Sequence, residues 1–239
     1  MGTFLAEYLT SLNLKRMQVE IWSDILCPFC YIGKRKFEKA LNGSAHKNRI
    51  QIIWKSFQLS PDLVTDTDTS VYEYLAKHKG ISMEQARQMT DHVAQMAASE
   101  GLEYHFDKAI HANSFDAHRF LQLAKTHGLQ DEAEEKLFEA YFTKGKNIAN
   151  HETLVQLGTA IGLDEKNMHD VLSSQEYTDE VMQDIYEAQQ VGVKGVPFFV
   201  FDRKYAVSGA QDTKVFAEVL GKSFTEWHQN HPDLSEAIE

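Results

Sequence analysis

Residues 24–37 read DILCPFCYIGKRKF, and this stretch holds both cysteines of the 239-residue chain, Cys27 and Cys30. Two thiols at this spacing either bind a metal or exchange electrons as a dithiol–disulfide couple. A structural zinc site needs four ligands, and the sequence has no second cysteine pair, no compact cysteine–histidine pattern and no HExxH motif. The spacing therefore favours redox chemistry, and we predict no metal site.

The cysteines stand where an expected strand meets an expected helix. Residues 17–22 alternate as a strand does, and residues 31–41 place apolar side chains near one face of a helix. Cys27 then precedes the helix, where free backbone N–H groups and the helix dipole stabilise a thiolate. Pro28 suits the first helical turn, because its missing N–H costs nothing there. Cys30, one turn later and expected to be more buried, is placed to attack a mixed disulfide at Cys27.

An alternative is that both cysteines are inert core residues. Pro28 between them and the polar flanking residues Asp24 and Lys34 favour an exposed edge instead.

Residues 48–57 also have the composition of a strand. Residues 196–201 and 204–208 are expected to form a hairpin that turns at Asp202–Arg203. A last amphipathic helix is expected over 212–220. The two strands expected at residues 17–22 and 48–57 cannot bury their faces alone, so they must pair with the hairpin to form one sheet.

The segment between these ends is expected to be helical after a polar, turn-like stretch at residues 59–70. Capping boxes predict helix starts at Ser70–Glu73, Ser82–Gln85 and Ser173–Glu176. Met83, Met89, Val93 and Met96 form one apolar helix face, typical of core filling. The helical block is then an insertion in a small α/β domain.

Composition excludes some functions. The formal net charge is −11, which argues against non-specific binding to nucleic acid or to an anionic membrane. No apolar run reaches the roughly 18–20 residues of a membrane span. Residues 1–16 lack the order of a secretory signal, with basic residues only after the apolar stretch, so we expect a cytoplasmic protein.

The motifs CPFCYIGKRKFEKAL (27–41) and GVPFFVF (195–201), continued by KYAVSGAQ (204–211), resemble DsbA-like thioredoxin-fold proteins. They are most similar to the FrnE-type branch, which is related to 2-hydroxychromene-2-carboxylate isomerase and kappa-class glutathione transferases. FQLSPD (57–62) and NSFDAHRFLQLA (113–124) extend the resemblance, which covers nearly all of residues 17–220. It implies an α/β, thioredoxin-like fold with a large inserted all-helical domain.

With that fold we expect an N-terminal extension over residues 1–16 and a discontinuous thioredoxin-like domain over 17–60 plus 188–225. The inserted helical domain would span 61–187, and a C-terminal tail would span 226–239.

The resemblance also implies a site. Val196–Pro197 is expected to be a cis peptide beside Cys27 and Cys30, with the Val196 backbone pairing with an extended substrate. The alternative is an ordinary trans proline that begins a strand. Pro28 and Phe29 are expected to contact substrate, and the catalytic residues are then Cys27, Cys30 and Pro197.

His118 and Arg119 are further candidates for contact with substrate or with a glutathione carboxylate, the alternative for His118 being a satisfied buried histidine. Asp24 is a candidate proton acceptor for Cys30 through water, the alternative being a solvated loop acid. Phe29 stands where the branch more often has tryptophan. Without a cationic neighbour in the motif, Cys27 should be less acidic than in strong oxidants, so we expect a moderately oxidising couple.

The predicted function is a cytoplasmic thiol–disulfide oxidoreductase or isomerase acting on protein or small-molecule disulfides. No bound cofactor is expected, and electrons would come from glutathione or a thioredoxin-type reductant. One alternative is a glutathione-dependent isomerase or transferase acting on small aromatic compounds. Another is a holdase that uses the methionine-lined helical block.

Overall fold

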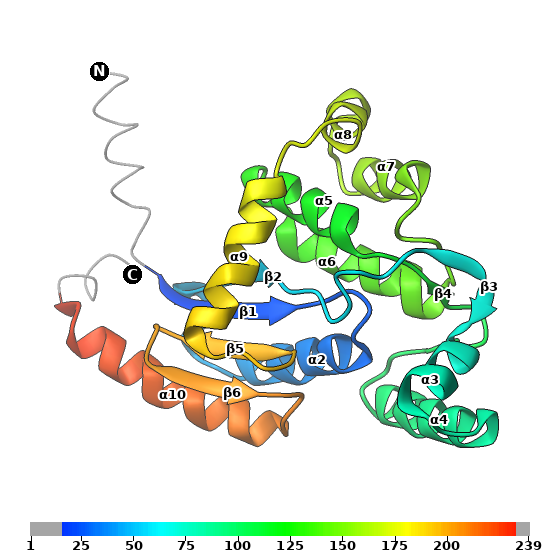
Figure 1. Ribbon diagram of the computed structural model, residues 1–239. Coiled ribbons are helices and arrows are strands. Elements are labelled where there is room, and N and C mark those ends of the chain that lie inside the picture. The colour runs from blue at the N-terminus through cyan, green and yellow to red at the C-terminus, as the bar shows by residue number, and fades with distance from the viewer. Residues whose placement is uncertain (1–15, 233–239) are drawn as a thin grey trace.

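The computed structural model describes residues 16–232, so the predicted extension lies almost entirely outside the described residues (Figure 1). At its centre is a four-stranded sheet in the order β2-β1-β5-β6. The strands are β1 (Met17–Ser23), β2 (Ile50–Ser56), β5 (Phe198–Phe201) and β6 (Tyr205–Ser208). β1 pairs in parallel with β2 and antiparallel with β5, and β5 and β6 form a hairpin. The two ends of the chain therefore share one sheet, as predicted.

The hairpin turns without glycine. Asp202 and Arg203 both adopt positive φ, 49° and 55°, which twists the turn to match the strands.

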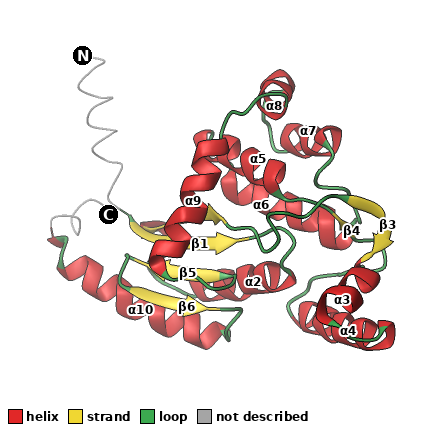
Figure 2. Cartoon of the chain, in the orientation of Figure 1, coloured by secondary structure: helices red, strands yellow, loops and turns green. Residues whose placement is uncertain are grey.

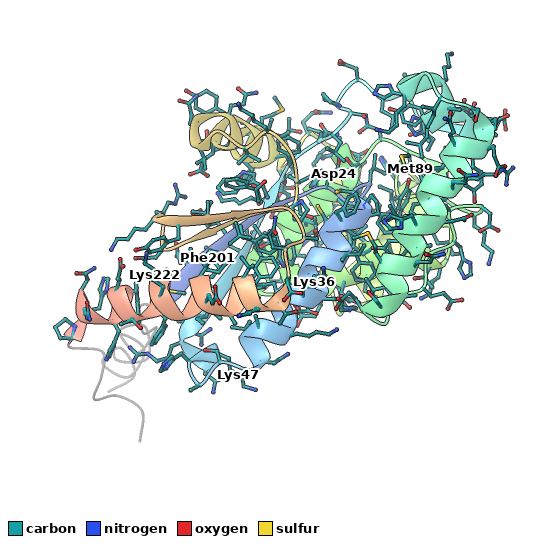
Figure 3. All side chains as sticks on the ribbon, turned by 90° about the horizontal axis from the view of Figure 1, so that it is seen from below. Asp24, Lys36, Lys47, Met89, Phe201 and Lys222 are labelled. Carbon is teal, nitrogen blue, oxygen red and sulfur yellow. The ribbon has the colours of Figure 1, made fainter. Side chains whose placement is uncertain are left out.

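Helices α2 (Pro28–Asn42) and α10 (Thr213–Gln229) cover one face of the sheet and lie side by side (Figure 3). Four phenylalanines fill the space between them and the strands: Phe37, Phe199, Phe201 and Phe216, all at most 1% exposed. The Phe199 and Phe216 rings meet edge to face with centroids 4.6 Å apart. This packing fixes α2, and with it the cysteines, against the sheet.

Helix α9 (Thr178–Val191) packs on the other side, against β2. The buried Asp184 carboxylate accepts hydrogen bonds from the Ser56 N–H (3.0 Å), Lys55 Nζ (2.9 Å) and Gln122 Nε2 (2.7 Å). The predicted domain boundary at residues 187/188 falls inside this continuous helix, which packs against both β2 and the insertion.

The inserted segment contains most of the helices, which surround the main sheet on the right and upper side of the view (Figure 2). They are α3 (Val71–Lys79), α4 (Met83–Ser99), α5 (Phe115–Thr126), α6 (Gln130–Phe138), the π-helical turn η2 (Glu139–Thr143), α7 (His151–Ala160) and α8 (Glu165–Leu172). A short 3₁₀ turn, η1 (Lys47–Arg49), precedes β2. The fold class is confirmed: a thioredoxin-like α/β fold with a large helical insertion.

Two of the three predicted capping boxes are present, at Ser70–Glu73 and Ser82–Gln85, each with both reciprocal hydrogen bonds. The third is wrong, because Ser173 ends α8 and the next helix starts only at Thr178. There the Ser173 hydroxyl donates to the His169 carbonyl of the preceding turn, 2.7 Å away.

The insertion is not purely helical. A two-stranded antiparallel sheet joins β3 (Asp66–Ser70) to β4 (Ile110–His111), inside the stretch predicted to be turn-like and the block predicted to be helical. The β3 residues DTDTS are polar on both faces and β4 is two residues long, so neither produces an apolar alternation.

Helix α10 continues to Gln229, nine residues past the predicted end and into the predicted tail from residue 226. The Asp212 side chain caps its start by accepting from the Lys214 N–H at 2.9 Å. Leu220, Phe224 and Trp227 stay buried at helical spacing, which explains the extension.

Candidate active site

Cys27 is the N-cap residue of α2, with extended φ and ψ of −86° and 109°, and Pro28 follows as the first helical residue. The Cys27 thiol donates to the Val196 carbonyl, with 3.3 Å between Sγ and O. The Val196–Pro197 peptide is cis, which confirms that prediction. The helix start of α2 and the loop before β5 thus meet at the Cys27 sulfur.

Pro197 approaches α2 at Gly33. A Cβ at Gly33 would lie 2.9 Å from Pro197 Cγ and 3.5 Å from both Phe199 Cζ and Ala210 Cβ. The missing side chain therefore lets the Pro197 loop pack directly on the active-site helix. Whether Pro197 acts in catalysis stays a prediction.

Gly33→Ala is expected to lower the free energy of unfolding. Overpacking a fitted site costs about 1–3 kcal/mol, more than the gain of about 1 kcal/mol from alanine's helix propensity. Gly221→Ala in α10 is the matched control, because its Cβ would meet nothing within 4 Å and should stabilise the protein. Urea unfolding of both variants tests this. A stabilised Gly33→Ala protein would contradict the packing argument.

The two thiols differ in their surroundings. Both are free and buried, with 4% of Cys27 and 1% of Cys30 exposed, but Cys27 lines a cavity. Burial, together with the adjacent Cys27 sulfur, raises the pKa of Cys30 well above its ordinary value; the Asp24 backbone and the Ser23 hydroxyl act in the opposite direction. Cys27 is therefore the thiol that lines the cavity, whereas Cys30 is not among the residues that line it.

The prediction of an exposed edge at Asp24 and Lys34 is wrong. Their exposed fractions are 0% and 2%. The Asp24 carboxylate accepts from the backbone N–H groups of Leu26 (3.2 Å) and Leu59 (2.8 Å). Lys34 lies among three carboxylates, which raises its pKa against the effect of burial. Both charged groups can be buried because the folded chain supplies hydrogen-bond donors to Asp24 and carboxylates to Lys34. The residue types alone do not reveal these partners.

A cavity of about 430 Å³ opens next to Cys27, between the CPFC motif and helices α3 and α4. Cys27, Pro28, Phe29 and Val196 line it, so the structure brings these four predicted site residues together. The opposite wall is mostly apolar and includes Leu59, Val71, Leu75, Met89, Val93 and Phe106. Met89 lies on α4, on the side turned toward α2 (Figure 3). Among the described residues, the wall holds one lysine, Lys79, and no arginine or carboxylate.

His118 lies apart from this cavity. It is 1% exposed, on α5, with its Nε2 3.6 Å from the Asp24 carboxylate. Neither ring nitrogen has a hydrogen-bond partner among the described residues. The nearest charged group to the His118 ring is therefore the Asp24 carboxylate. Contact of His118 with substrate stays a prediction.

Two residues of the site did not stand out in the sequence, Ser23 and Glu134. Glu134 on α6 is 1% exposed, and its Oε1 accepts a hydrogen bond from the Ser23 hydroxyl at 2.7 Å. Burial raises the pKa of Glu134 to about 7. The sequence feature that could have identified Glu134 is its spacing of three and four residues from the apolar Leu137 and Phe138. This spacing places Glu134 on the buried face of the helix.

In residues 16–232, no group of three or more histidines, cysteines and carboxylates is arranged to hold a metal ion. Over the same residues, no helix is both long and apolar enough to cross a membrane.

Residues 18–221 match the model of the DSBA-like thioredoxin domain. The chain belongs to the DSBA-like thioredoxin domain family. A crystal structure of a probable DsbA oxidoreductase from Streptomyces coelicolor is 40% identical, with a TM-score of 0.83, and the match covers 88% of this chain and 91% of that one.

Two further similarities extend over most of the chain. An uncharacterized protein, YwbO, from Bacillus subtilis is 26% identical over 85% of this chain and 96% of its own length. The structure of a 2-hydroxychromene-2-carboxylate isomerase shares the fold, with a TM-score of 0.63 at 17% identity, over 92% of this chain and 100% of that one. The predicted resemblance to DsbA-like proteins and to this isomerase is confirmed at the level of family and fold.

Proposed function

We propose that this protein is a thiol–disulfide oxidoreductase or isomerase that works through Cys27 and Cys30. The observation that carries the proposal is the position of the two sulfurs. Cys27 is the N-cap residue of α2 at the edge of a cavity, and the buried Cys30 lies in the first turn of the same helix. Family membership supports an enzyme of this kind.

The reaction runs in two steps. The Cys27 thiolate attacks one sulfur of a substrate disulfide, forming a mixed disulfide and releasing the other sulfur as a thiolate. The Cys30 thiol then loses its proton and attacks Cys27 Sγ, which breaks the mixed disulfide and releases the second substrate thiolate. Two electrons pass to the substrate and a Cys27–Cys30 disulfide remains. The same steps in reverse oxidise a dithiol substrate.

The proposal is tested by incubating the reduced protein with a peptide that contains one disulfide. We expect stoichiometric reduction of the peptide and an internal disulfide in the protein, both seen by mass spectrometry after alkylation. A peptide left oxidised at any protein concentration would contradict the proposal.

The cavity supports substrates with an apolar group beside the disulfide. Its wall is mostly apolar, with polar groups from Lys79, His111 and several hydroxyl-bearing residues, so it suits an aromatic or aliphatic substituent better than the charged ends of glutathione. Glutathione or a thioredoxin-type protein remains our proposed reductant rather than the preferred substrate. A cytoplasmic location remains a prediction of the sequence.

Met89→Glu is expected to raise the KM for an aromatic disulfide roughly tenfold, because it places a carboxylate in the apolar wall. The KM for hydroxyethyl disulfide, which is too small to fill the cavity, should stay unchanged. Met182→Glu is the matched control, since Met182 is 51% exposed on α9 and outside the cavity wall. Steady-state kinetics with both disulfides tests this. An equal change for the two substrates would show that the cavity does not select them.

The same cavity favours a second candidate, a glutathione-dependent isomerase or transferase that acts on a small aromatic compound. An apolar site of about 430 Å³ beside a reactive sulfur is what such chemistry needs. This candidate predicts saturable glutathione binding and an activity that survives Cys30→Ser, whereas the oxidoreductase loses turnover in that variant.

A further inference from the structure

The wall of the cavity beside Cys27 contains a tyrosine hydroxyl that makes no hydrogen bond within the described part of the protein. Tyr141 is 5% exposed and lines the cavity, and its hydroxyl has no hydrogen-bond partner among residues 16–232. Its oxygen is not one of the fully enclosed, unpartnered side-chain atoms of those residues, so it faces open space. A hydroxyl in such surroundings is stabilised by a ligand atom that accepts its hydrogen bond.

The backbone at the end of α6 directs this side chain toward the cavity. There the π-helical turn η2 replaces the α-helix, and the Lys144 N–H donates to the Glu139 carbonyl, five residues earlier, at 3.0 Å. Turns of this kind often occur at functional sites. Tyr141 and Phe142 both lie in η2 and both line the cavity, with their rings edge to face and centroids 4.8 Å apart. This contact restricts the Tyr141 ring and gives the hydroxyl a defined position.

The wall has five other side chains with oxygen or nitrogen, and most have partners or face water. The Ser60 and Tyr74 hydroxyls share a hydrogen bond of 3.4 Å, and the Thr90 hydroxyl donates to carbonyls of its own helix at 3.1 and 2.8 Å. Lys79 is exposed in the last turn of α3. His111 is the exception, since it is 8% exposed and makes no hydrogen bond to a described residue. Its Nε2 is fully enclosed and its ring packs on Tyr74 with centroids 3.5 Å apart, which leaves it less open to a ligand than the phenol.

Tyr141 and His111 are both uncharged near neutral pH. Burial raises the pKa of Tyr141, and the Asp24 carboxylate acts in the same direction, so the phenol keeps its proton and is a donor. Burial lowers the pKa of His111 against the effect of Asp66, so the imidazole is neutral at pH 7. A ligand carboxylate would therefore meet no buried positive charge in this wall, whereas a carbonyl oxygen needs only a hydrogen-bond donor.

We infer that this cavity selects substrates whose aromatic or aliphatic group carries an uncharged acceptor oxygen, such as a carbonyl, to which the Tyr141 hydroxyl donates a hydrogen bond. The hydrocarbon part packs against the apolar wall, which includes Leu75, Met89 and Val93. An apolar cavity with a few placed polar groups is the usual form of a small-molecule site, and the polar groups set the orientation of the ligand. The inference rests on the proposed function for the chemistry at Cys27, and it names a substrate class and a residue that determines specificity.

The test uses two ligands of nearly the same shape that do not react with thiols, 2-acetylnaphthalene and 2-isopropenylnaphthalene. Only the first has an acceptor oxygen. Calorimetry with the reduced full chain measures both dissociation constants. In Tyr141→Phe, affinity for the ketone should fall about tenfold and affinity for the alkene should be unchanged, because one neutral hydrogen bond is lost. Tyr186→Phe, which removes an exposed hydroxyl of α9 outside the cavity wall, is the matched control and should bind both ligands as the wild type does.

Three further measurements separate binding from a structural role. Tyr141→Phe should keep the wild-type stability in urea, because the hydroxyl has no partner in the described protein to lose. His111→Leu should leave the ratio of the two dissociation constants unchanged. With carbon-13 in the carbonyl, the infrared band of the ketone bound to the wild type should lie at lower wavenumber than in an apolar solvent, and this readout does not depend on whether the variant folds.

The charge of the ligand is tested with 2-naphthoate, which has the same ring system. It should bind the wild type more weakly than the ketone. Tighter binding of the carboxylate would overturn the assignment of an uncharged acceptor.

An unchanged ratio in folded Tyr141→Phe, a changed ratio in His111→Leu instead, an unshifted carbonyl band in the wild type, or no binding of either naphthalene would overturn the inference. The peptide-disulfide assay is independent of these results. A peptide left oxidised by a protein that binds the ketone through Tyr141 would remove the proposed function and keep the binding site. A reduced peptide without ketone binding would do the reverse.

Discussion

Cys27→Ser is expected to lower the exchange rate with disulfide substrates by a factor on the order of 10³ or more, while Cys30→Ser traps a mixed disulfide at Cys27. The asymmetry follows from position. Cys27 borders the cavity and caps α2, whereas Cys30 is enclosed behind it. In the proposed reaction, removing Cys27 removes the thiol that lines the cavity and attacks the substrate, and removing Cys30 removes the thiol that resolves the adduct.

Turnover of a peptide disulfide and intact-protein mass spectrometry measure both effects. The double variant, Cys27→Ser with Cys30→Ser, gives the background rate and should carry no adduct. Circular dichroism should show the same fold for all three variants, because serine is close to cysteine in size. An adduct on Cys30 in the Cys27→Ser protein, with activity retained, would reverse the assigned roles.

Arg119→Met is expected to lower the free energy of unfolding by about 3 kcal/mol or more. Arg119 is 3% exposed, and its guanidinium donates to the Glu176, Val171 and Ser174 carbonyls and to the Asp116 carboxylate. It thereby ties the end of α8 and the following loop to α5. Methionine fills part of the space but leaves these acceptors without their donor.

Urea unfolding measures the loss. Arg87→Met is the control, because Arg87 is exposed on α4 and stacks on Tyr72, so it should change stability by about 1 kcal/mol at most. Equal, small effects of the two substitutions would show that the Arg119 contacts contribute little. Peptide-disulfide turnover should be unaffected in folded Arg119→Met, since the residue lies outside the cavity wall.

The parts of the fold that could be predicted are those with a strong local signal. The apolar alternation of residues 17–22 and the CPFC–helix junction correspond to β1 and α2, and the late hairpin had to pair with them because two strands alone are unstable. The reciprocal bonds of Ser70 and Ser82 likewise depend on residues three positions apart. Such features need no knowledge of the rest of the chain.

What could not be predicted depends on long-range pairing. β3 and β4 are held together by partners some 40 residues apart, and their sequences carry no apolar alternation. Asp24 and Lys34 look like surface residues until the inserted helices and neighbouring loop supply their partners. Glu134 is far from the cysteines in sequence, so only the folded chain reveals it beside Ser23.

The central claim is that Cys27 and Cys30 form a reversible dithiol–disulfide couple. The most direct test equilibrates the protein in a series of reduced-to-oxidised glutathione mixtures, quenches it by alkylation and counts free thiols by mass. We predict that both thiols disappear together at one moderately oxidising midpoint, without a stable glutathione adduct. A stable single adduct with no internal disulfide, or two thiols that remain free in every mixture, would contradict the account.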